Sequence, residues 1–114
     1  SYVRASFAEK LAPKVGLADM KSNAYLMGLF SLIDACLDRP LPEILEELPI
    51  DSSVKNALLG QPNGYRYLLD LVMAYEQGEW PVVNRLLKKF GVAEDTIPQY
   101  YLKAVQEAHD LMQY

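Results

Sequence analysis

Apolar residues recur along this chain at spacings of three and four, and no segment alternates apolar and polar residues as a surface strand does. These spacings predict a succession of helices over residues 3–15, 23–37, 42–48, 54–59, 65–77, 80–90 and 97–112. Glycine or proline stands at nearly every break, where a helix is expected to end. The pattern therefore predicts an all-α fold, a compact bundle of about seven helices, with residues 1–114 forming a single domain.

The segment from Asn23 to Leu37 is apolar on nearly every side. A helix of this kind has to be covered by other helices, so it is expected at the centre of the fold. Gly28 lies inside it, although glycine within a helix costs about 1 kcal/mol relative to alanine. We therefore predict that a second helix backbone crosses close to Gly28.

Capping signals predict where three of the helices begin. Pro42 suits the first turn of the short third helix, and Asp51 or Ser52 can cap the fourth. Thr96 and Gln99 have the spacing of a capping box for the last helix. The buried face of that helix is expected to consist of Ile97, Tyr100, Tyr101, Ala104, Val105, Ala108, Leu111 and Met112.

Composition narrows the classes of function. The formal net charge of −4 argues against a nucleic-acid surface, which needs a basic patch. No apolar run reaches the ~20 residues of a membrane span. The single cysteine, Cys36, cannot form an internal disulfide, so it is expected as a small buried hydrophobe in a reducing, cytoplasmic compartment. Because the first residues already have the pattern of a mid-helix segment, we expect the chain to be part of a longer protein.

Residues that could carry out catalysis or hold a metal are few. His109 is the only histidine, and with a single cysteine no Cys/His cluster can be assembled. The chain has neither a Gly-x-Ser-x-Gly elbow nor a phosphate-binding glycine loop followed by Lys-Ser/Thr. We therefore expect no catalytic residue, no metal and no cofactor, and a partly exposed His109 on the last helix.

Four residues are candidates for an interaction surface. The chain has eight tyrosines and one tryptophan, and such rings dominate the energetics of interfaces when they are exposed. Trp80 begins a helix, and Tyr100 and Tyr101 are adjacent, so these three rings cannot all point into one core. Asp34 lies within the apolar central helix, where it could be a salt-bridge member, an exposed rim residue or a functional acid.

Several stretches of the chain resemble, in the same order, the sequences of a known family. They are residues 24–35 (AYLMGLFSLIDA), 39–41, 46–50, 54–60 and 74–80. In this order they resemble the HDOD domain, the HD-related output domain of bacterial signalling proteins. The similarity is to the subgroup that joins this domain to an upstream EAL domain of the cyclic di-GMP phosphodiesterase type. It implies the second half of an HD-domain-like helical fold.

The resemblance also implies that the chemistry of HD enzymes is missing. In those enzymes the matching helix reads roughly Gly-Leu-Leu-His-Asp-Ile-Gly, with His-Asp as metal ligands. Gly28-Leu29-Phe30 and Ile33 of this chain match that pattern, but Ser31 and Leu32 stand in place of the His-Asp pair. Serine and leucine cannot hold a divalent metal in the same way.

These observations favour a non-catalytic regulatory domain that acts through protein contacts and is linked to cyclic di-GMP signalling. The expected partner is the upstream EAL-type region of its own chain, another signalling protein or a second copy, and neither nucleic acid nor membrane. One alternative is a metal-dependent phosphohydrolase of the HD type, which Ser31 and Leu32 disfavour. Another is a helical-repeat scaffold, for which we find no second copy of a repeat.

Overall fold

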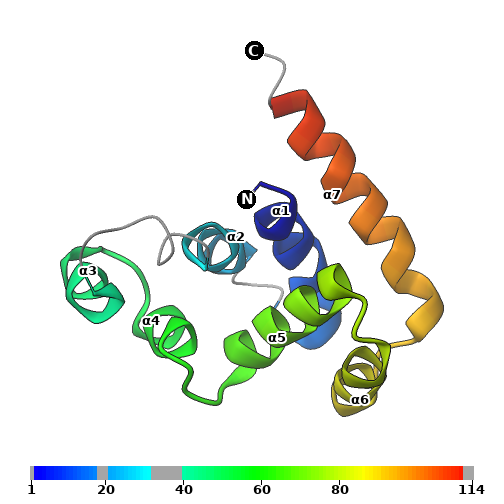
Figure 1. Cartoon of the computed structure of the whole chain (residues 1–114), viewed down its shortest axis with the longest axis horizontal. Coiled ribbons are helices and arrows are strands. Elements are labelled where there is room, and N and C mark those ends of the chain that lie inside the picture. Colours follow the sequence, from blue (N-terminus) through cyan, green and yellow to red (C-terminus); the bar gives the residue numbers. More distant parts are fainter. Residues whose placement is uncertain (1, 18–20, 32–39, 112–114) are drawn as a thin grey trace.

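The computed structural model describes residues 2–17, 21–31 and 40–111 (Figure 1). None of these residues lies in a β-strand, and the predicted all-α class is confirmed. The part of the predicted central helix beyond Ser31, with Asp34 and Cys36, lies outside the described residues. The described residues form seven α-helices, which are α1 (Tyr2–Leu11), α2 (Lys21–Phe30), α3 (Leu41–Glu47), α4 (Ser52–Leu58), α5 (Gly64–Gln77), α6 (Trp80–Phe90) and α7 (Ile97–Leu111).

The first predicted helix ends earlier than its apolar spacing indicates. Helix α1 ends at Leu11, and the chain continues as a 3₁₀ helix over Ala12–Val15. Pro13 explains the change, because it has no N–H to donate to the carbonyl of Glu9 and its ring crowds that turn. Gly16 follows with a left-handed φ of 85° and closes the 3₁₀ helix, as predicted for this glycine.

The structure confirms one predicted cap, corrects another and adds a third. The Asp51 side chain caps α4 by accepting a hydrogen bond from the Ser53 N–H, at 3.2 Å. The predicted capping box at Thr96 is wrong, because Thr96 ends a short 3₁₀ helix and its hydroxyl donates back to the Ala93 carbonyl, at 2.8 Å. Asn63, which we did not predict as a cap, begins α5 by accepting from the Arg66 N–H at 2.8 Å.

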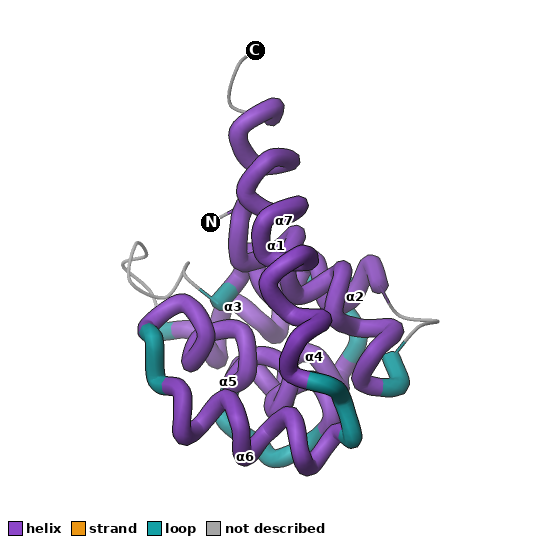
Figure 2. Tube along the Cα trace, turned by 90° about the vertical axis from the view of Figure 1, so that its right-hand side faces the viewer, coloured by secondary structure: helices purple, strands orange, loops and turns teal. Residues whose placement is uncertain are grey.

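Helix α1 lies between α2 and α7, and α5 packs against it as well (Figure 1). Helix α4 contacts both α2 and α5, and α6 packs against α5. Figure 2 shows α7 extending past the other helices toward the C-terminus. The N-terminal helix therefore organises the described part of the chain, since α2, α5 and α7 all pack on it.

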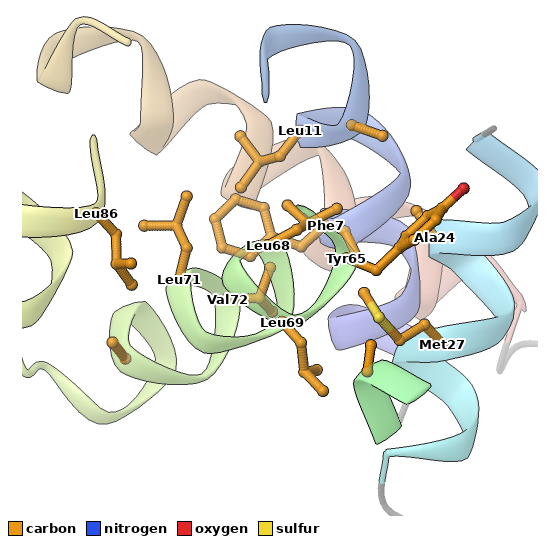
Figure 3. Packing of buried hydrophobic residues seen from close by; sticks show 14 of the residues in the cluster. Phe7, Leu11, Ala24, Met27, Tyr65, Leu68, Leu69, Leu71, Val72 and Leu86 are labelled. Atoms are coloured by element: carbon orange, nitrogen blue, oxygen red, sulfur yellow. The ribbon is translucent and has the colours of Figure 1, made fainter. Parts of the chain in front are cut away.

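The hydrophobic core lies where these helices meet (Figure 3). Phe7 of α1, Met27 of α2, and Leu68 and Val72 of α5 are fully buried there. Each of these side chains comes from a helix face predicted to be apolar, so the local pattern and the tertiary packing agree.

Close packing at Gly28 confirms the prediction for this glycine. A Cβ atom built on Gly28 would lie 2.5 Å from the Cα of Ala5 and 3.0 Å from the carbonyl oxygen of Arg4. These are backbone atoms of α1, which cannot turn away as a flexible side chain would. Glycine is therefore required at this position for α1 and α2 to cross so closely.

The predicted buried face of α7 is only partly correct. Ile97, Ala104 and Ala108 are buried, but Val105 is 38% exposed and Leu111 is 51% exposed. Residue spacing placed all of them on or near one face, but α7 runs past the beginning of α1, so no described helix lies beneath its last turn (Figure 1). Met112, the last residue of the predicted face, lies outside the described residues.

Candidate interaction site

Four aromatic rings from four helices form a continuous cluster at the side of the core. The Phe7 ring meets the Tyr75 ring at a centroid distance of 5.3 Å and the Tyr101 ring at 5.2 Å, both edge-to-face. Tyr75 and Tyr101 are 5.2 Å apart, and Trp80 meets Tyr75 edge-to-face at 5.3 Å. We call these four residues the aromatic cluster. Such geometries add stabilisation beyond simple burial, so each ring helps to position its neighbours.

The exposed end of this cluster provides the candidate site. Phe7 is fully buried and Tyr75 is half-buried, whereas Trp80 is 53% exposed. Val105 lies one helical turn beyond Tyr101 on α7 and is also exposed. We call Trp80, Tyr75, Tyr101 and Val105 the aromatic surface. An aromatic ring that is half in contact with solvent and held from behind by a packed core is typical of a protein-binding surface.

The local structure fixes Trp80 in this place. Gly78 follows the last residue of α5 with a left-handed φ of 71°, and α6 begins two residues later at Trp80. The ring lies close to Gly78, because a Cβ atom on that glycine would be 3.9 Å from the indole Cζ2. Pro81 in the first turn of α6 restricts the backbone further. The tight turn therefore holds the indole against Tyr75.

The Tyr75 phenol is uncharged at neutral pH. Burial raises its pKa above the usual value near 10, and the neighbouring Tyr101 phenol raises it further. The Tyr75 ring at the base of the aromatic surface consequently carries no charge at neutral pH. This favours an apolar or hydrogen-bonding partner at that point over an ionic one.

The other predicted site residues do not join this surface. Tyr100 is adjacent to Tyr101 in sequence, but its ring lies near the ammonium group of Lys14, 5.9 Å from the ring centroid. The two adjacent tyrosine rings thus contact different residues, and only Tyr101 belongs to the aromatic surface. Asp34 lies outside the described residues. His109 is exposed on α7, as expected from the sequence.

An ion-pair network that the sequence analysis did not find joins α1, α2 and α5. The Arg4 guanidinium donates to the Glu76 carboxylate, with Nη2 2.9 Å and Nε 3.2 Å from its oxygens. Its Nη1 donates to the Ser31 hydroxyl at 3.1 Å, and that hydroxyl donates to the Gly28 carbonyl at 2.8 Å. Ser31 is therefore engaged in a structural contact that joins α1 to the end of α2.

No group of three or more His, Cys, Asp or Glu side chains that could hold a metal is found among the described residues. In the same residues, no helix is both long enough and apolar enough to cross a membrane.

A second polar contact fastens α7 to α1. Glu107 accepts hydrogen bonds from the Lys10 ammonium group at 2.5 Å and from the Ser6 hydroxyl at 2.6 Å. These two donors, Lys10 first, hold the pKa of the Glu107 carboxyl below its usual value. Ser6 is buried, so its hydroxyl depends on Glu107 as an acceptor.

The lowered pKa of Glu107 predicts a pH-dependent contribution to stability. Because the folded-state pKa is depressed, the contribution is complete above the unfolded pKa of about 4.3 and is lost as pH falls through the folded value. Between about pH 6 and about pH 3, the difference in unfolding free energy between wild type and Glu107→Gln should therefore shrink. Chemical denaturation at several pH values measures it.

Asp110→Asn provides the matched control, because it removes one carboxylate from the exposed side of the same helix. Its stability relative to wild type should change less with pH than that of Glu107→Gln. If the two variants have the same pH dependence, the contact between Glu107 and α1 does not stabilise the fold.

Comparison with known proteins gives two relatives. The chain is 37% identical over 112 residues to the uncharacterized protein YuxH of Bacillus subtilis, and the alignment covers 98% of this chain and 27% of the relative. It is 29% identical over 111 residues to the cyclic di-GMP phosphodiesterase CdgJ of Vibrio cholerae, covering 97% of this chain and 26% of the relative. The chain thus spans about a quarter of the length of these curated relatives. No family model and no solved structure matches it.

Proposed function

We propose that this chain is a non-catalytic regulatory module of the HDOD type in cyclic di-GMP signalling. In this proposal it acts by docking its aromatic surface onto a phosphodiesterase domain of the EAL type in the same longer protein. The observation that carries the proposal is the similarity to CdgJ over 97% of this chain, in an alignment that covers only 26% of that phosphodiesterase.

The arrangement of side chains supports a role without catalysis. At the position where an HD enzyme has a metal-binding histidine, Ser31 bonds to Arg4 and to the Gly28 carbonyl. Such a serine helps to join helices and does not offer a ligand to a divalent metal. The described residues present an exposed indole on a rigid support, and this is a means of contact with another protein.

The docking surface is tested with isothermal titration calorimetry. The 114-residue chain is titrated into the separately produced phosphodiesterase portion of the protein in which it occurs. We expect saturable binding by the wild-type chain, and a loss of about tenfold or more in affinity for Trp80→Ala, since exposed aromatic anchors dominate such interfaces. The rate of cyclic di-GMP hydrolysis by that portion should change when the wild-type chain is added.

Leu59→Ala is the matched control, because Leu59 is also an exposed large apolar residue, at the end of α4 and away from the aromatic cluster. It should leave the affinity unchanged, and circular dichroism should show that both variants are folded. An unchanged affinity for folded Trp80→Ala would contradict the assigned surface. Self-association, or binding only to a different signalling protein, would contradict the assigned partner.

A further inference from the structure

A groove lies between α5 and α6, separate from the aromatic surface. It has a volume of about 460 Å³. We call it the α5–α6 groove, and the lining residues that matter here are Tyr67, Met73, Val82, Arg85, Leu86 and Lys89. The face of α5 that lines it points away from the core residues Leu68 and Val72, so the groove is open to solvent. Its size is within the usual range of ligand-binding clefts in proteins.

The floor and the rim of the groove differ in character. Met73 and Val82 are half-buried and Leu86 is buried, and all three line the groove, so its floor is apolar. Arg85 and Lys89 are exposed and stand one helical turn apart on α6, at the basic end of the groove. An apolar floor beside a charged rim is the arrangement that binds an amphipathic segment of another protein.

The cations at this rim have few acidic partners. Among the described residues Arg85 forms no ion pair, and the Lys89 ammonium lies over the Tyr67 ring, 3.7 Å from its centroid. Asp70 also lines the groove, but its carboxylate pairs with Arg66 at 3.1 Å. The remaining acid, Glu79, precedes α6 and so lies at the opposite end of that helix from Lys89. The rim beside Lys89 is consequently positive in a chain whose net charge is −4.

A purely structural explanation accounts for part of this charge. Lys88 and Lys89 lie in the last turn of α6, where cations interact favourably with the helix dipole. Arg85 lies in the middle of the helix, where that effect is absent. The helix dipole therefore does not account for Arg85, which lines the groove beside its apolar floor.

We propose that the α5–α6 groove binds an acidic amphipathic segment of a partner protein. One apolar side chain of that segment packs on Met73, Val82 and Leu86, and a carboxylate pairs with Arg85 and Lys89. This inference goes beyond the proposed function, because it concerns a second surface and a different partner chemistry. It does not depend on the aromatic surface or on a link to cyclic di-GMP.

The test uses two fluorescein-labelled synthetic peptides of about 15 residues, a length that can form an amphipathic helix. Both have leucine and phenylalanine on one face, and the remaining positions are glutamate in one peptide and lysine in the other. Fluorescence polarisation with the whole chain should show saturable binding of the glutamate peptide and at least tenfold weaker binding of the lysine peptide. Added salt should weaken the binding of the glutamate peptide.

Three variants locate the binding. The double variant Arg85→Glu/Lys89→Glu should weaken binding of the glutamate peptide about tenfold or more, and Met73→Gln should weaken it through the apolar floor. Lys55→Glu/Lys103→Glu makes the same change in net charge on α4 and α7, and it should reduce the affinity much less. Circular dichroism melting curves show whether each variant is folded.

Several results would overturn the inference. One is equal binding of the two peptides, and another is an equal loss of affinity in the two double variants, which would mean that net charge alone matters. A third is no saturable binding of the glutamate peptide to the folded wild-type chain. Binding to vesicles containing phosphatidylserine, without binding to the glutamate peptide, would assign the rim to a membrane surface instead.

Discussion

Gly28→Ala is expected to destabilise the fold by at least about 2 kcal/mol, because the added methyl group would overlap the backbone of α1. The new Cβ would lie 2.5 Å from the Ala5 Cα and 2.9 Å from the Ala5 nitrogen. Helices α1 and α2 would have to separate, which would also disturb the bonds that Arg4 makes to Ser31 and Glu76. Thermal unfolding should show a lower Tm by roughly 8 °C or more.

The sign of this effect is informative, because helix propensity alone predicts the opposite. Glycine to alanine within a helix is stabilising by about 1 kcal/mol when nothing else changes. Gly64→Ala is the matched control, since Gly64 begins α5 and a Cβ there would meet only the Leu17 Cδ2 atom, at an ordinary 3.6 Å. It should change stability by less than about 1 kcal/mol. A Gly28→Ala variant as stable as wild type would mean that α1 and α2 do not cross this closely.

Phe7→Ala is expected to cost about 3–5 kcal/mol, which is a large part of the ~5–15 kcal/mol that holds a typical domain together. Phe7 is fully buried where α1, α5 and α7 meet, and it contacts the rings of Tyr75 and Tyr101. Truncation leaves a cavity that these rings can fill only by leaving their present positions. Guanidinium denaturation followed by far-UV circular dichroism measures the loss.

The aromatic surface should change along with stability in this variant. Trp80 is the only tryptophan, so tryptophan fluorescence reports on the indole ring that packs edge-to-face against Tyr75. The milder change Phe7→Leu keeps most of the buried volume, and it should still shift the emission of Trp80 if the aromatic cluster positions the indole. Tyr2→Ala is the control, because Tyr2 is exposed on the same helix. A cost for Phe7→Ala no greater than for Tyr2→Ala would contradict the central place of Phe7 in the core.

Much of the fold could be predicted because its signals lie within a few residues of one another. The 3.6-residue period of apolar positions marks a helix wherever it occurs, and the glycines after it mark the end. The Asp51 cap is of the same kind, since donor and acceptor lie two residues apart. Asn63 could have been found in the same way, as an Asn just before an apolar-periodic segment. Even Gly28 was predictable, because an unfavourable residue inside a helix indicates a compensating close contact.

The candidate site could be predicted only in part. An exposed Trp80 at a helix start was a reasonable candidate, but the sequence did not distinguish Tyr101 from Tyr100, and only the positions of α1 and of the 3₁₀ helix after it separate them. The groove between α5 and α6 was not predicted either. Lys89 is explained by its place at the end of a helix, and only the structure places Arg85 beside an apolar floor.

By itself, the sequence determined the helices, most of their ends and the need for a close helix crossing at Gly28. These features depend on local periodicity and local backbone geometry. Only the tertiary structure decided which distant residues meet. Arg4 and Glu76 are 72 positions apart, and Ser6 and Glu107 are 101 apart, so no local pattern relates them. The same reason explains the error at Leu111: spacing shows which face of a helix is apolar, but whether a partner helix extends far enough to cover that face depends on how the helices are placed in space.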